Sequence, residues 1–210
     1  MVKKKKMTLR QMLKKENKAF NKLSAPKKRV ALAKDVIIQL GIKNFKAYPG
    51  VYVFPRVTDI GILQNIDTNN NIQQANLLVS QGVISCEVCA KGAIFMSHVM
   101  KTNSCSVKEV KYSNSNEPVT DRVSEFFDRD QLNLIEAAFE ENPDMYTEDA
   151  IDDLDDGDDI IWDLPDPKEI RKIEKLANKA VKFGDKYKTP HNRLIAIMKN
   201  IIKNKGTFKP

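Results

Sequence analysis

The sequence predicts a mainly α protein of about seven helices, with a small β element and a flexible acidic segment between helices. Apolar residues recur at helical spacing along much of the chain, and capping residues or prolines precede these runs. Only one short run, at residues 51–54, is β-branched and aromatic. Hydrophobic residues make up 41% of the 210 residues, which is enough to build a core.

Five helices have recognisable end signals. Thr8 and Gln11 stand at capping-box spacing before one apolar periodic run, and Asp128 and Gln131 repeat that spacing before another. Proline suits the first turn of a helix, and glycine often follows the last turn. These two signals bound three more predicted helices, at residues 25–41, 167–184 and 190–206.

The best strand in the chain is predicted at Val51–Phe54, after the turn residues Pro49 and Gly50. Pro55 has no N–H to give to a ladder, so we expect it to end this strand or to place it at a sheet edge. Residues 68–71 are predicted to form a loop, and residues 114–118 a polar linker.

A buried helix is predicted over Ser85–Lys101, in the most apolar region. Gly92 would let another backbone approach closely, so Gly92→Leu is expected to cost about 1–3 kcal/mol or more. Lys91→Ala should stay within about ±0.5 kcal/mol. That second value assumes that the polar side chains form one solvent-facing stripe at helical steps: Glu87, Lys91, His98 and Lys101.

Charge is sorted into blocks along the chain. Residues 1–60 carry 16 Lys and Arg against three acids, and residues 61–119 carry four of each sign. Residues 120–169 hold 19 acids against three bases, and residues 170–210 hold 12 bases against two acids. Such asymmetry indicates a polyanionic partner or pairing between the blocks.

The same blocks suggest a division of the chain into four parts: a basic helical region at 1–45, an apolar α-rich core at 46–142, an acidic flexible linker at 143–167 and a basic helical hairpin at 168–210. Three cysteines, an odd number, favour a reducing compartment. No apolar stretch approaches the roughly 20 residues that cross a bilayer, and no apolar segment follows the basic N-terminus. We therefore expect a soluble, intracellular protein without a membrane partner.

A zinc site is the main candidate for metal chemistry. Its candidate ligands would be Cys86, Cys89, His98 and Cys105. On one continuous helix, Cys89 and His98 would lie about 180° apart around the axis and roughly 13 Å apart along it. Zinc would therefore require the helix to begin after Cys89. The favoured interpretation has no cofactor: the cysteines are small buried side chains, and His98 lies on the exposed face.

Two other interpretations of local motifs are weaker. A redox C-x-x-C pair normally opens a helix in a βαβ context, and no such alternation is visible. Asp152–Asp159 resembles a calcium loop, but Leu154 would occupy a position that requires an oxygen ligand. This acidic stretch is better interpreted as a solvated linker. The alternative is a docking segment anchored by Trp162.

Lysines on the predicted N-terminal helices could contact phosphates without reading sequence. Arginine is sparse there, which argues against recognition of particular bases. The candidate nucleic-acid-binding residues are Lys14, Lys15, Lys18, Lys22, Lys27, Lys28 and Arg29.

No catalytic signature is present. The chain has no phosphate-binding glycine loop, no nucleophile elbow and no metalloprotease helix. His98 and His191 are the only histidines available as bases near neutral pH. We therefore expect a protein that is not an enzyme.

Four short stretches together resemble uncharacterised small proteins encoded by tailed bacteriophages and prophages. The stretches are residues 28–36, 86–93, 130–139 and 193–202. This resemblance implies no transferable activity and no site residue. It implies expression in the cytoplasm of an infected bacterium, and an accessory role.

The leading interpretation is a non-catalytic accessory protein that binds a nucleic acid, a nucleoprotein or a host protein through its segregated charges. The alternative is a zinc-stabilised or enzymatic domain centred on the Cys/His cluster. A further hypothesis is that the acidic residues 144–166 fold back on the basic ends and compete with a polyanion.

Overall fold

The computed structural model describes residues 15, 17–57, 71–72, 83–102, 105–106, 123–147 and 167–210. Helices dominate these residues, and a three-stranded sheet accompanies them, so the predicted fold class is confirmed. The bounds of the main helices are α2 (Ala25–Gly41), α5 (Ala90–Thr102), α8 (Arg129–Glu140), α10 (Pro167–Gly184) and α11 (Pro190–Lys203). The Thr8 capping box, the 68–70 part of the predicted loop, the 114–118 linker and the 152–159 stretch lie outside the described residues.

The three-stranded sheet has the order β1-β4-β2, with bounds β1 (Phe45–Ala47), β4 (Val83–Val88) and β2 (Val53–Val57). The central strand β4 runs parallel to β1 and antiparallel to β2. Pro55 lies within β2 at the edge of this sheet, as its missing N–H predicted. Two-residue strands β3 (Asn71–Ile72) and β5 (Cys105–Ser106) form a separate antiparallel pair.

The prediction of one helix over Ser85–Lys101 is wrong in its first turn. Residues 85–88 belong to strand β4, and helix α5 begins only at Ala90. An apolar run cannot be assigned to helix or strand by periodicity alone. The partner that settles the assignment is β1, whose Phe45 pairs with Cys86 from far away in the sequence.

The predicted exposed stripe on this segment is also wrong. Glu87, Lys91 and His98 are buried, and each lies beside a group that is distant in the sequence. Glu87 forms an ion pair with Lys46, with 2.9 Å between the Lys46 Nζ and Glu87 Oε1 atoms. Lys101 forms another with Asp35 of α2, with 3.1 Å between Nζ and Oδ1. Polar groups at these positions therefore join elements instead of facing water.

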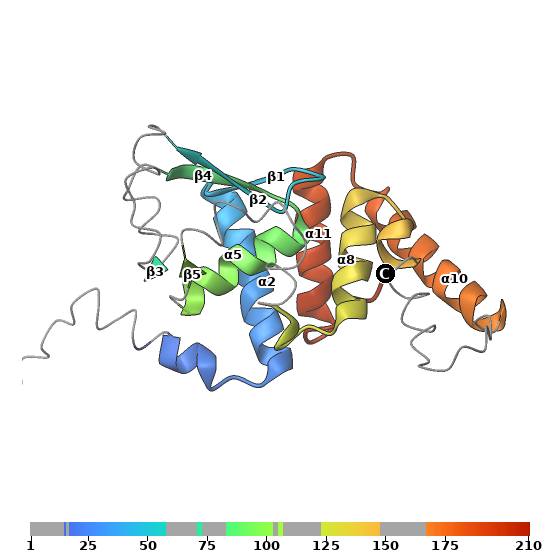
Figure 1. The fold of residues 1–210 in the computed structure, drawn as a ribbon, viewed down its shortest axis with the longest axis horizontal. Coiled ribbons are helices and arrows are strands. Elements are labelled where there is room, and N and C mark those ends of the chain that lie inside the picture. Colours follow the sequence, from blue (N-terminus) through green and yellow to red (C-terminus); the bar gives the residue numbers. More distant parts are fainter. Residues whose placement is uncertain are drawn as a thin grey trace, which may run out of the picture.

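The helices form a layered bundle around one continuous core (Figure 1). Helix α5 packs against α2 and α8, α11 packs against α2 and α8, and α10 packs on α8. Figure 1 shows the sheet near one end of α2 and α10 on the outer side of α8. The core runs from Phe20 to Phe208 and thus includes residues of both basic ends. The four-part division of the chain stays a prediction.

Local signals set the helix ends as predicted. Asp128 caps α8 by accepting a hydrogen bond from the Gln131 N–H at 2.7 Å. Thr189 caps α11 in the same way, with the Asn192 N–H as donor at 3.2 Å. Gly206 follows α11 with φ of 103°, a backbone conformation that a side chain would strain.

Gly92 is the position where helix α5 meets the backbone before β2. A Cβ atom built there would lie 1.5 Å from the carbonyl oxygen of Tyr52. The expectation of close backbone approach at Gly92 is therefore confirmed, and the contact is so tight that even a methyl group does not fit.

Gly92→Ala should lower the free energy of unfolding by about 2 kcal/mol or more, because the backbone around Tyr52 must move. Gly41→Ala is the matched control, since nothing lies within 4 Å of its Cβ position. It should be neutral or stabilising by up to about 1 kcal/mol. Urea denaturation of both variants measures the difference, and equal midpoints would contradict the assigned contact.

Candidate functional site

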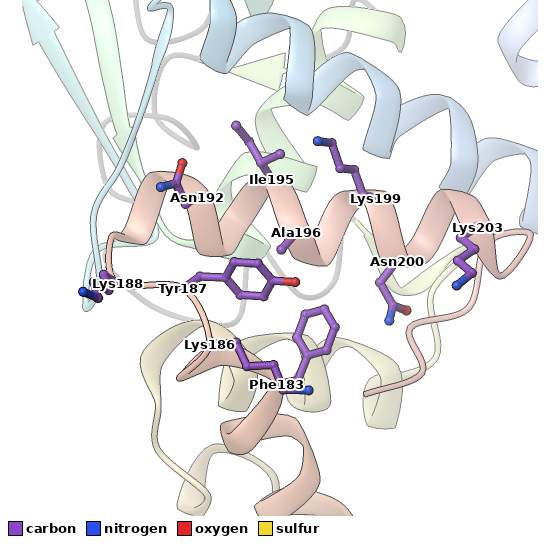
Figure 2. Close-up of a pocket in the computed structure, with 10 residues that line it drawn as sticks. All are labelled: Phe183, Lys186, Tyr187, Lys188, Asn192, Ile195, Ala196, Lys199, Asn200 and Lys203. Carbon is purple, nitrogen blue, oxygen red and sulfur yellow. The ribbon is translucent and has the colours of Figure 1, made fainter.

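A basic groove lies between the end of α10, the turn that follows it and the outer side of α11 (Figure 2). Its volume is about 720 Å³. Four lysines, two aromatic residues and two asparagines dominate its wall, and no acid contributes to the lining. These lining residues are Phe183, Lys186, Tyr187, Lys188, Asn192, Lys199, Asn200 and Lys203, together with Ile195 and Ala196.

Helical spacing explains why α11 presents this wall. Asn192, Lys199 and Lys203 recur at steps of seven and four, which places them near one side of the helix. Leu194, Ile197 and other apolar residues at the intervening positions are buried. The apolar side packs on α2 and α8, and the polar side is left for the groove.

The floor of the groove is aromatic and supported from below. The ring of Phe183 lies 5.7 Å from that of Tyr187 and 5.3 Å from that of Phe208, the latter edge to face. Figure 2 shows the Phe183 and Tyr187 rings between α11 and the end of α10. The ammonium of Lys186 lies 5.8 Å from the centre of the Phe183 ring. Packed rings lose little freedom on binding, so they suit a stacking platform.

Arg193 fixes the turn that borders the groove. Its guanidinium is buried and donates to the carbonyl oxygen of Phe139 at 2.6 Å and to that of Tyr187 at 3.5 Å. It also forms an ion pair with Glu141, just after α8. One side chain therefore joins the start of α11, the end of α8 and the aromatic turn.

The four groove lysines give this surface a concentrated positive charge. Within the described part of the chain, none of their ammonium groups lies within ion-pair distance of a carboxylate. Unpaired ammonium groups on a concave wall attract anions from solution. The groove is therefore suited to bind phosphate groups.

The N-terminal residues predicted to contact nucleic acid differ in their surroundings, and their role in binding stays a prediction. Lys15, Lys18, Lys22 and Lys27 are exposed, whereas Lys14 lies outside the described residues. Lys28 is half-buried, with its ammonium 5.8 Å from the centre of the Phe20 ring.

Arg29 from the same predicted set has a structural role. Its Nε donates to the carbonyl oxygen of Gly206 at 2.6 Å, and its Nη1 donates to that of Phe126. The guanidinium also lies 5.7 Å from the centre of the Phe127 ring. These contacts tie α2 to the C-terminal end of the chain and use two of the five N–H donors of the guanidinium.

Sequence reasoning missed the groove, although one signal was present. The 170–210 block carries 12 bases, and the aromatic residues Phe183 and Tyr187 fall within it. Basic residues interleaved with aromatic ones are typical of single-strand binding. That these aromatic residues face the same side as lysines of α11 follows only from the folded structure.

Of the predicted Cys/His zinc ligands, the three whose side chains are described do not form one cluster. Cys86 lies on β4, Cys89 precedes α5, and His98 lies further along α5. The His98 ring is held between Phe20 and Phe126, at centroid distances of 5.9 and 5.0 Å. The side chain of Cys105 lies outside the described residues. Among those described, Cys86 and His98 do not join Cys89 in a cluster of possible ligands.

Cys89 instead meets two carboxylates of α8. The Cys89 Sγ atom and one carboxylate oxygen each from Glu136 and Glu140 lie within 4.8 Å of one another. Glu136 also accepts a hydrogen bond from the Lys91 N–H at 3.2 Å, and the Lys91 ammonium donates to Asn133 Oδ1 at 2.9 Å. Sequence patterns could not predict this cluster, because its members come from two segments about 45 residues apart.

Burial favours the protonated forms of all three acidic groups. It raises the pKa of the Cys89 thiol well above its ordinary value, and the Glu136 carboxylate raises that pKa further. Burial also raises the pKa of Glu136, against the attraction of Lys91. Burial and the adjacent Glu136 raise the pKa of Glu140 to about 7.

No family model matches the chain, and neither a curated protein nor a solved structure matches it. Among the described residues, no helix combines the length and the apolar character that crossing a membrane requires.

Lys91→Met should lower the free energy of unfolding by about 3 kcal/mol. The nearly neutral effect expected for Lys91→Ala assumed an exposed side chain, whereas Lys91 is buried. The substitution by Met keeps the length of the side chain but leaves the buried Glu136 and Asn133 without their cationic neighbour. Lys34→Met, at an exposed position of α2, is the matched control and should stay within about 0.5 kcal/mol. Equal losses in urea denaturation would show that burial of the charge has no energetic role.

Proposed function

We propose that the protein is a non-catalytic binding protein whose basic groove takes single-stranded nucleic acid. This proposal rests on one observation: four lysines and the rings of Phe183 and Tyr187 line the same concave surface. Ammonium groups track a phosphate backbone, and aromatic rings stack on bases. The two together describe a single strand better than a duplex, whose bases are already stacked.

The residue types of the groove also indicate that it does not select particular bases. Its cations are lysines, which bind phosphate as point charges and lack the planar, five-donor fork that makes arginine geometrically selective. Asn200 is engaged with the C-terminal segment, since its Oδ1 accepts from the Lys209 N–H at 2.9 Å. Binding with little dependence on base sequence is therefore the expected behaviour. The resemblance to phage-encoded proteins suggests an infected bacterial cell as the setting.

The salt dependence of binding tests the role of the lysines. Lys199→Gln combined with Lys203→Gln should weaken binding of a fluorescent oligothymidylate by about an order of magnitude per lysine at 50 mM salt. The slope of log affinity against log salt should fall by about 0.7 for each phosphate that a lysine no longer neutralises. Fluorescence anisotropy over a salt series measures both quantities.

The matched control for charge is Lys172→Gln combined with Lys175→Gln. These lysines are exposed on α10 and do not line the groove, so their replacement changes the net charge equally. The control should retain most of the affinity. Equal weakening of the two double variants, or no binding by the wild type at 50 mM salt, would refute the proposed groove.

Stacking is tested separately at Tyr187. Tyr187→Ala should weaken oligothymidylate binding by about 1–3 kcal/mol while leaving the salt slope unchanged, because stacking releases no counterions. Tyr187→Phe keeps the ring and should bind like the wild type. Isothermal titration at two salt concentrations measures the effect. If Ala and Phe behave alike, the ring does not stack on a base.

A further inference from the structure

We propose that Cys89, Glu136 and Glu140 form a binding site for one divalent cation of the zinc type. The three donor atoms lie within 4.8 Å of one another and come from two separate elements, the segment before α5 and the last turns of α8. Cys89 and Glu136 are buried, and Glu140 is half-buried at the margin of the cluster. This site is separate from the groove, so it goes beyond the proposed function.

The donor set fits zinc chemistry. Zn²⁺ accepts thiolate sulfur at about 2.3 Å and carboxylate oxygen at about 2.0–2.2 Å. In a tetrahedral site these lengths separate neighbouring ligand atoms by about 3.5 Å. Since no pair is more than 4.8 Å apart, the widest pair needs to close by at most about 1.3 Å, within the reach of small side-chain rotations. Three protein ligands leave a fourth position for water.

The charge of the ligand set matches a divalent ion. When ionised, Cys89, Glu136 and Glu140 carry three negative charges, and Lys91 beside Glu136 supplies one positive charge. Arg193, which also attracts Glu140, is already paired with Glu141. Without a metal, burial keeps these groups protonated, and a divalent cation that displaces their protons would balance the remaining charge of −2.

Main-chain N–H groups hold each proposed ligand in place. The Gly50 N–H donates to both oxygens of Glu140, at 3.0 and 2.9 Å. Glu136 and Cys89 accept from the N–H groups of residues 91 and 92, the latter at 3.4 Å to sulfur. Supporting contacts of this kind orient ligands before a metal arrives.

The position of the cluster predicts what a bound cation would do. It would join the segment before α5 to the end of α8, with the turn at Gly50 held against Glu140. Because the unfolded chain does not assemble these donors, binding adds to the free energy of unfolding.

The test uses full-length protein that has been treated with a chelator and then titrated with Zn²⁺ or Co²⁺. We expect one zinc per chain, a rise in Tm on zinc addition, and the near-ultraviolet absorption of a cobalt–thiolate bond. Cys89→Ser should abolish the cobalt–thiolate band, and Glu140→Gln should weaken zinc binding by roughly tenfold or more. Glu140 is half-buried, which makes this second variant the safer one for folding.

Cys86→Ser is the matched control, because Cys86 is also a buried free thiol three residues away but lies outside the cluster. It should keep the zinc stoichiometry and the cobalt–thiolate band of the wild type. Zinc at well below one per chain in the wild type would overturn the proposal. Loss of the band in Cys86→Ser as complete as in Cys89→Ser, or unchanged zinc affinity in Glu140→Gln, would overturn it as well.

Discussion

Burial of charge between the start of α5 and the middle of α8 is the constraint on which the other contacts depend. The Lys91 ammonium and the Glu136 carboxylate are both removed from water, and the ammonium is bonded to Asn133 at 2.9 Å. A buried charge that loses its partner costs several kcal/mol, so shifts of one helix along the other are strongly disfavoured. Helix α8 is thereby positioned, and α10 and α11 both pack against it.

The end of α8 connects this buried network to the groove. Glu136 and Glu140 face the segment before α5, while Phe139 and Glu141 receive Arg193 from α11. Since Arg193 also donates to Tyr187, the aromatic turn is held at a defined distance from the core. The backbone of the aromatic turn is therefore anchored to the core, which would lower the entropy cost of ordering it in the proposed binding.

Sequence reasoning succeeded where the signal is local and failed where the partner is distant. The caps Asp128 and Thr189 act within four residues, so the first residues of α8 and α11 could be predicted. Strand β4 could not be predicted, because its apolar run fits a helix or a strand and only pairing with the distant strand β1 favours the strand. The burial of Lys91 was missed for the same reason: its partners lie on α8, about 45 residues further along the chain. Among the predicted zinc ligands whose side chains the structure describes, Cys89 alone belongs to the cluster with Glu136 and Glu140.

The protein therefore uses charge in two physically different ways, and salt separates them. The groove lysines are solvated, so the field with which they would attract the proposed ligand is screened over about 8 Å at physiological ionic strength. The contacts of Lys91 are shielded from the solvent, so ions in solution screen them far less. Raising the salt concentration should therefore weaken the proposed binding of a polyanion while leaving the α5–α8 network intact. The basic block at 170–210 thus supplies the lysines of the groove, whereas the buried Lys91 joins α5 to α8.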